Sequence, residues 1–143
     1  MRCDEIVRFC ILFVSHLNFC LFIFVTNCSL SSVIYEVNIS VDANVFDEFM
    51  AWLQPHMKEL LALDGFEKAT LFERVATEEG AEKDDSKKLL TCHYHVQSRE
   101  HLQNYFDHHA ARLRGDGMKR FEKHFQIERR ILHEKLSFDK QDS

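Results

Sequence analysis

The alternation of apolar and polar side chains along residues 33–41 predicts a β-strand with two different faces. In this stretch, VIYEVNISV, the odd positions carry Val, Tyr, Val, Ile and Val, and the even positions carry Ile, Glu, Asn and Ser. Successive side chains of a strand point to opposite sides, so each set occupies its own face. We expect helices to cover the apolar face, and the polar face to meet water, a ligand or another subunit.

The rest of the pattern predicts three more strands and two helices. The strands are expected at residues 66–75, 89–96 and 124–133, and the charged stretch 77–88 is expected to be a solvated hairpin loop. Apolar residues at helical spacing fill the two remaining intervals. The order strand, helix, strand, strand, helix, strand predicts an α+β fold, the ferredoxin-like βαββαβ sandwich: a four-stranded antiparallel sheet with two helices on one face.

Each predicted helix has an expected start and an expected break. The first, residues 43–63, is expected to be capped by Asp42 and to kink or restart at Pro55, because proline removes a backbone hydrogen bond. The second is expected to be capped by Ser98 and interrupted by Gly115-Asp116-Gly117. The positions expected to face the sheet are Phe46, Met50, Leu53, Met57 and Leu60 or Leu61 in the first helix, and Leu102, Tyr105, Phe106, His109 and Leu113 in the second.

Residues 33–136 are expected to form one domain. Its charge and its cysteine content restrict the partners and sites that it can have. The net charge of the chain is -5, and the charged residues within 1–32 cancel, so the deficit belongs to the rest. An acidic domain is a poor partner for a phosphate backbone, and no nucleic acid is expected. Four of the five cysteines precede the domain, which leaves Cys92 as an expected buried residue and excludes an internal disulfide or a cysteine-based zinc site. Residues 137–143 are expected to be a flexible tail.

Residues 1–32 are predicted to be a hydrophobic leader. The run 9–25 is apolar except at three positions, which suits a signal-peptide core or a short membrane span. A cleaved signal, a retained anchor and an upstream extension of the gene model all stay open. Localisation is open as well. The domain reads as cytoplasmic, because it has no cysteine pair and its one sequon, at Asn38, lies inside a strand, whereas a genuine leader implies the secretory route or a membrane.

The polar face of the sheet is the first candidate site. The first and third strands are central neighbours in the predicted topology, so Glu36, Asn38, His93 and His95 are expected to converge. Gln126, Glu128 and Arg130 are expected beside them. The two histidines could bind a metal ion together with a nearby carboxylate or His124. Hydrogen bonds between subunits explain the same residues more simply, and no metal is predicted.

The helix layer is the second candidate site. Trp52 and His56 lie one helical turn apart, and His56, His109 and Arg112 are expected to form a polar pocket between the helices and the sheet edge. A core histidine with a satisfied hydrogen bond and a general base are both compatible with this position. The catalytic candidates are therefore His56, His109 and His93. The basic residues between 112 and 130 are interspersed with acidic ones, so salt bridges or anion binding are possible.

Three sequence features support a family resemblance. They are the opening VIYEVNISVD, the Trp52 and His56 pair followed by LLALDGF, and HAARLR (109–114) leading through Arg120-Phe121 to the last strand. From residue 33 to about 136 the chain resembles a family of small uncharacterised proteins of the dimeric α+β barrel superfamily. The resemblance implies that two open sheet faces pack together, and relatives include cofactor-independent monooxygenases, muconolactone-type isomerases and heme-binding enzymes. The chain departs from the family in its long leader and in the position of Pro55.

Three functional hypotheses follow. The leading one is a homodimer that binds a small molecule in a cavity between the two sheets. The second is a monooxygenase- or isomerase-like enzyme without a cofactor that uses a histidine as acid or base. The third is a structural dimer without a ligand. Partners are the second copy and the ligand, with a membrane only through residues 9–25. The ligand-binding candidates are Glu36, Asn38, Trp52, His93, His95, Arg112, Glu128 and Arg130.

Overall fold

Strand β1 (Val33–Asp42) lies at the centre of the sheet in the computed structural model, which describes residues 32–82 and 84–136. The predicted hydrophobic run 9–25 and the predicted tail lie outside these residues. Within the described part of the chain, no helix combines the length and the apolar character needed to cross a membrane.

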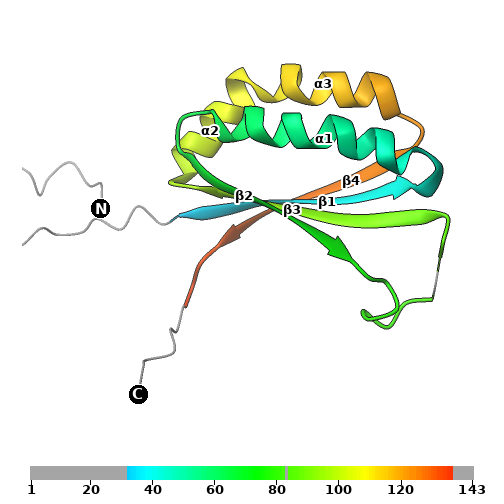
Figure 1. Cartoon of the computed structure of the whole chain (residues 1–143). Coiled ribbons are helices and arrows are strands. Elements are labelled where there is room, and N and C mark those ends of the chain that lie inside the picture. Colours follow the sequence, from blue (N-terminus) through cyan, green and yellow to red (C-terminus); the bar gives the residue numbers. More distant parts are fainter. Residues whose placement is uncertain (1–31, 83, 137–143) are drawn as a thin grey trace, which may run out of the picture.

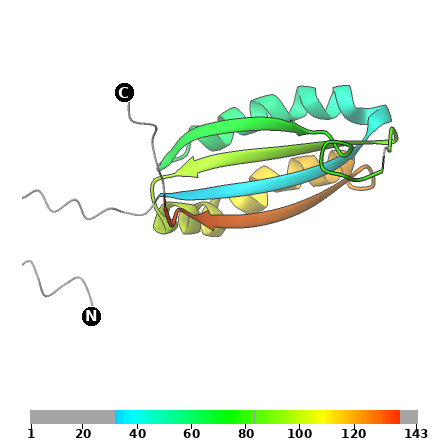
Figure 2. The same cartoon turned by 90° about the horizontal axis from the view of Figure 1, so that it is seen from below.

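The elements confirm the predicted α+β fold. One antiparallel sheet has the strand order β2-β3-β1-β4, and three helices cover one of its faces (Figure 1) while the other face is open (Figure 2). A short 3-10 helix (Ala43–Val45) leads from β1 into the first α-helix. The other elements are α1 (Phe46–Leu61), β2 (Phe66–Arg74), β3 (Lys87–Val96), α2 (Arg99–His108), α3 (Ala110–Phe121) and β4 (Phe125–His133).

The alternation of β1 carries directly into the core. Its odd-numbered residues are all buried beneath the helices, and its even-numbered residues are half-buried on the open face. Each buried side chain of this size stabilises the fold by about 1.5–3 kcal/mol relative to an exposed one. β1 pairs along nearly its whole length with β3 on one side and with β4 on the other. In β3 and β4, as in β1, one side of the strand therefore faces the helices and the other belongs to the open face of the sheet.

The buried face of α1 differs from the predicted one. Phe49 is fully buried and packs edge-on against Phe121, whereas Phe46 and Met50 are only half-buried. The helix begins after a 3-10 turn with fewer residues per turn, so its phase is shifted relative to a single helix from residue 43. The predicted core positions Leu53 and Leu60 are confirmed.

Neither the predicted side-chain cap of Asp42 nor a restart of α1 at Pro55 is found. The side chain of Asp42 makes no capping hydrogen bond; it pairs with Lys87 and accepts from His124 Nδ1 at 3.0 Å. The helix continues through Pro55 without a restart, and Pro55 is exposed, on the solvent side. An exposed proline leaves a carbonyl that water can hydrogen-bond, so continuation is possible at that position.

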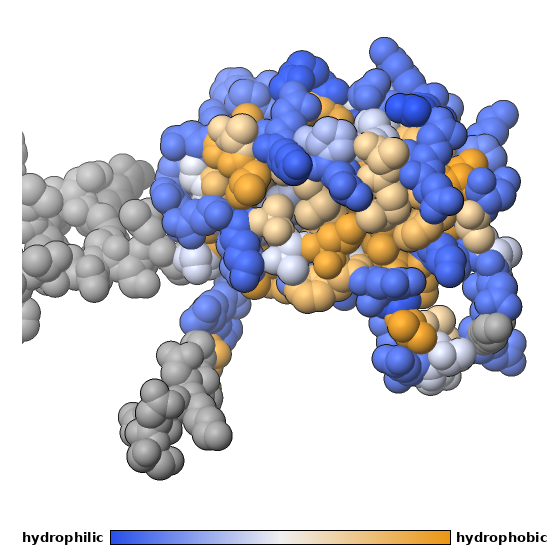
Figure 3. Space-filling model, in the orientation of Figure 1, coloured by the Kyte–Doolittle hydropathy of each residue, from blue (hydrophilic) through white to orange (hydrophobic). Residues whose placement is uncertain are grey.

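Where α1 meets the edge strand β2, apolar side chains reach the surface (Figure 3). Residues of both elements line a groove there: Met50, Met57, Leu61, Ala69 and Leu71.

The second predicted helix is two helices, and it breaks at an unexpected residue. Ser98 caps α2 as predicted, with its hydroxyl accepting from the His101 N–H. The break lies at half-buried His109, whose φ of -124° and ψ of -31° are not helical, whereas the glycines lie inside α3. Gly117 has a packing role there. A Cβ at this position would lie 2.5 Å from the Trp52 ring, so glycine allows α1 and α3 to approach closely.

The two glycines of α3 provide a matched pair of substitutions. Gly115 has open space around it, so Gly115→Ala is expected to raise the free energy of unfolding by about 0.5–1 kcal/mol through helix propensity alone. Gly117→Ala is expected to lower it by about 1 kcal/mol or more, because the Trp52 ring must move. Urea denaturation followed by circular dichroism measures both. Equal stabilisation by the two substitutions would contradict the close approach.

Candidate functional site

The open face of the sheet carries a hydrogen-bonded polar row. His93 Nε2 lies 2.9 Å from Glu36 Oε2, and Asn38 Nδ2 donates to Glu36 Oε1 at 2.7 Å. Thr91 Oγ1 in turn donates to Asn38 Oδ1 at 2.6 Å. The side chain of Glu36 is only 13% exposed. Hydrogen bonds from Asn38 and His93, with the charge of Arg130, hold the pKa of Glu36 below its usual value.

Most of the predicted residues of this face lie together. Arg130 is opposite Glu36 in the sheet, with its Nη1 3.7 Å from Glu36 Oε1, and it donates to Glu128 at 2.9 Å. His95 lies one row away, opposite Ile34 and Lys68. Among residues 32–82 and 84–136, no group of three or more His, Cys, Asp or Glu side chains is placed to hold a metal ion.

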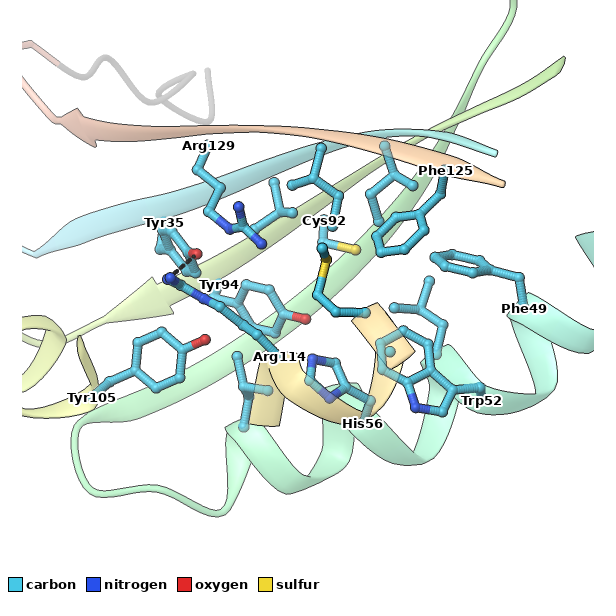
Figure 4. A pocket seen from close by; sticks show the side chains of 17 residues that line it. Tyr35, Phe49, Trp52, His56, Cys92, Tyr94, Tyr105, Arg114, Phe125 and Arg129 are labelled. Atoms are coloured by element: carbon cyan, nitrogen blue, oxygen red, sulfur yellow. Dashed lines mark hydrogen bonds between the residues drawn. The ribbon is translucent and has the colours of Figure 1, made fainter. Parts of the chain in front are cut away.

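A cavity of about 40 Å³ lies on the opposite side of the sheet, beneath the helices (Figure 4). We call it the helix–sheet pocket. It is larger than the roughly 10–15 Å³ that one water molecule needs. Parts of its wall carry polar groups: three tyrosines, two arginines, and the stacked pair Trp52 and His56. Apolar side chains of β1, α1 and β4 complete the lining.

Tyr35 and Arg114 are linked inside the pocket. Arg114 Nη2 donates to the Tyr35 hydroxyl at 3.0 Å, and its guanidinium lies over the rings of Tyr105 and Phe106, 5.5 Å and 5.4 Å from their centroids. Burial raises the pKa of Tyr35, against the opposing charges of Arg114 and Arg129. The phenol is therefore neutral and accepts a hydrogen bond from a cation.

Trp52 and His56 form the opposite side of the pocket. Their rings stack with centroids 4.6 Å apart, and Trp52 Nε1 donates to Asp116 Oδ2 at 3.0 Å. Burial lowers the pKa of His56, against the raising effect of Glu59 and Asp116. The neutral imidazole is therefore favoured, and it can act as a proton acceptor.

Cys92 lies in the same lining but is not set up as a nucleophile. Burial raises the pKa of its thiol to about 12, so the reactive thiolate is not populated near neutral pH. The predicted burial of Cys92 is confirmed.

The predicted cluster of His56, His109 and Arg112 is only partly formed. His56 and Arg112 line one shallow surface groove, together with Glu59, which accepts from Arg112 at 2.7 Å. His109 is not among the residues that line it, because it occupies the break between α2 and α3.

Sequence reasoning missed the two arginines of the helix–sheet pocket. Arg114 and Arg129 belong to a basic run whose expected partners were nearby acids in sequence. The alternation of side chains along β4 could have revealed Arg129. It lies on the same side of the strand as the apolar residues Phe125, Ile127 and Ile131. A charged residue on the apolar side of a strand points to a site beneath the helices.

Comparisons with known proteins identify the family and the fold. The family described as "Domain of unknown function (DUF4286)" matches residues 32–135. No curated protein sequence matches the chain. Similar solved structures include a conserved protein from Methanosarcina mazei Go1, with a TM-score of 0.56 and 13% identity over 75% of this chain and 96% of that one. Another is a mutant of SnoaB, a cofactor-independent oxygenase from Streptomyces nogalater, with a TM-score of 0.54 and 10% identity over 76% and 98%. Such identities establish the fold alone.

The lowered pKa of Glu36 predicts a pH-dependent contribution to stability. A carboxyl group with a depressed pKa stabilises the fold above its unfolded value of 4.5, and this stability is lost as the pH falls through the folded value. Glu36→Gln is therefore expected to lower the free energy of unfolding by about 1–2 kcal/mol near pH 7, and the difference from wild type is expected to shrink as the pH falls below 4.5.

Glu128→Gln is the matched control, because the Glu128 side chain is 64% exposed on the same face. It is expected to change stability by less than about 0.5 kcal/mol at either pH. Urea denaturation across the pH range measures both variants. A Glu36→Gln effect of the same size at both ends of the range would show that the carboxylate charge is not involved.

Proposed function

This chain belongs to the DUF4286 family, and we propose that its domain binds a small organic molecule in the helix–sheet pocket. The observation that carries the proposal is the composition of the lining. Apolar and aromatic side chains enclose the cavity, and a few polar groups, among them His56, Tyr35 and Arg114, converge on it. Ligand sites in proteins combine a mostly apolar wall with a small number of orienting polar groups.

The size of the cavity limits how the ligand is held. A space of about 40 Å³ admits a functional group rather than a whole ring, so the remainder of the ligand extends toward the surface. Met118 lines the pocket and is 45% exposed, which places it at the rim. Its unbranched thioether adapts readily to different neighbours, so the rim can widen without disturbing the strands.

We also propose that two copies associate through the open face of the sheet. Phe72 and Leu132 are large apolar side chains on that face and are 46% and 37% exposed. Glu36 and Arg130 give the same face both signs of charge, so two copies related by a two-fold axis could place opposite charges against each other. In such a dimer the six ligand-binding candidates of the open face lie between the two sheets: Glu36, Asn38, His93, His95, Glu128 and Arg130.

A second candidate function is that of an enzyme without a cofactor, of oxygenase or isomerase type. The fold resembles that of SnoaB, and His56 supports the proposal because it lines the pocket and its lowered pKa favours the proton-accepting form. His93 faces the other side of the sheet and His109 lies outside this lining, so His56 is the strongest of the three candidate bases.

Filling the pocket is expected to weaken ligand binding. Ile127 and Ile131 are half-buried residues on the same side of β4, but only Ile127 lines the pocket. Ile127→Phe is expected to weaken the binding of neutral aromatic amides by about tenfold or more, and Ile131→Phe to leave it unchanged within about twofold. Trp52 is the only tryptophan of the chain, so its fluorescence and its single indole N–H resonance report on the pocket.

A panel of one-ring and two-ring aromatic amides serves as the probe. If none produces a saturable change at Trp52 in the wild-type protein, the proposed binding function is wrong. Mass analysis of the amides after aerobic incubation separates the two candidate functions. Unchanged compounds favour binding alone. A product that forms with the wild-type protein and not with the His56→Gln variant favours the enzyme.

The proposed dimer predicts a substitution that separates it. Phe72→Glu is expected to convert a wild-type dimer to a monomer in sedimentation equilibrium, because it places a charge against the partner's sheet. Leu61→Glu, a similar change at a 36% exposed residue of α1, is expected to leave the dimer intact. A wild-type protein that sediments as a monomer at high concentration would contradict the proposal.

A further inference from the structure

We infer that the ligand of the helix–sheet pocket carries a carboxylate, which Arg114 and Arg129 bind. The inference rests on the proposed function and names the chemical class of its ligand. It follows from the placement of two guanidinium groups, from the absence of a counter-charge in the pocket lining, and from the size of the cavity.

Arg114 is held in place with donors left over. It extends from α3 into the layer between the helices and the sheet, where Tyr35 accepts a hydrogen bond from it and two aromatic rings support its plane. A guanidinium carries five N–H donors, and the Nε of Arg114 is buried without a hydrogen-bond partner among the described residues. The neutral Tyr35 hydroxyl does not balance the charge.

Arg129 brings a second cation to the same place. It lies opposite Val37 in the sheet, on the side that faces the helices, and it lines the pocket. Figure 4 shows Arg129 and Arg114 both directed toward the Tyr35 hydroxyl. The two side chains come from different elements, β4 and α3, so no single local motif places them together.

No carboxylate among residues 32–82 and 84–136 pairs with these two arginines. The residues that line the pocket include no Asp or Glu. Within the described part of the chain, neither Arg114 nor Arg129 forms an ion pair, whereas Arg112, Arg120 and Arg130 each do. Arg114 is half-buried and has lost part of its hydration, whereas Arg129 is exposed, and both line the same cavity. An anionic group bound there would be stabilised by both charges.

A carboxylate suits the space better than a phosphate does. It is planar, carries one charge, and matches the two parallel donors of a guanidinium. The cavity of about 40 Å³ lies between the arginines and the apolar side chains of β1 and β4, so it has room for a small planar group. The apolar or aromatic remainder of the ligand then extends past exposed Met118 toward the surface.

The test compares aromatic carboxylates with the primary amides of the same skeleton. Benzoate and benzamide, and the corresponding two-ring pairs, have nearly the same shape and differ in charge. Binding is followed by the indole N–H resonance of Trp52. In the wild-type protein we expect each carboxylate to bind about tenfold or more tightly than its amide, because its hydrogen bonds are charge-assisted.

Arg129→Met is the main variant, because Arg129 is exposed and its loss should not prevent folding. It is expected to weaken carboxylate binding by about ten- to hundredfold and amide binding by much less, because the amide carries no charge, so the ratio of the two affinities falls by about tenfold or more. Arg120→Met is the matched control, an exposed arginine of α3 that pairs with Glu48, and it is expected to leave both affinities unchanged. Arg114→Met is expected to weaken carboxylate binding in the same way, provided that the variant still unfolds cooperatively on heating.

The possible outcomes separate this inference from the proposed function. Amides that bind as tightly as carboxylates, or an Arg129→Met variant that keeps full carboxylate affinity, would overturn the inference and leave the binding function standing. Phenyl phosphate that binds more tightly than benzoate would overturn the assignment of a carboxylate. If neither series binds, both proposals are wrong.

Discussion

The pairing of β1 with β3 on one side and β4 on the other is the constraint on which the rest of the molecule depends. Hydrogen bonds along both edges of β1 fix which of its side chains are buried and which are not. A shift of β1 by one residue would expose Tyr35 and Val37 and bury Glu36. Apolar burial would be lost, and the carboxylate would be desolvated. One strand thereby separates the two faces of the domain into chemically different surfaces.

The layer between sheet and helices is not uniform. At one end, aromatic rings pack closely around Phe49, with Trp52 and Phe121 as neighbours, and Gly117 makes room for the Trp52 ring. At the other end, amphipathic tyrosine and arginine side chains replace purely apolar ones, and their polar ends need partners. The first part supplies stability, and the second leaves space beside polar groups that a packed apolar core would not contain.

The fold followed from the sequence because strand alternation is a local property. The four strands, their order along the chain and the covered face all derive from a two-residue period. Details that depend on distant contacts did not follow. The phase of α1 is set by a short 3-10 turn, and the break at His109 has no residue type that marks it. Gly117 looked like a helix breaker, and its actual role depends on Trp52 in another helix.

The candidate site was predictable only in part, for the same reason. The row around Glu36 and His93 follows from topology, because opposite positions on adjacent strands share a face. The helix–sheet pocket requires knowledge of how deeply α3 sits over the sheet, which no local pattern contains. Trp52 and His56 were recognised as a pair one turn apart, but Arg114 was grouped with surface arginines because its neighbours in sequence are charged.

Arg129 and Arg130 are consecutive on β4, yet they serve opposite faces of the sheet. A slip of this edge strand by one residue would turn Arg129 to the open face and place the side chain of either Glu128 or Arg130 beneath the helices. Pairing errors in β4 would therefore damage both surfaces at once. An edge strand is usually discussed as a risk for aggregation. In this domain the register of the edge strand also decides which charged side chain lies beneath the helices.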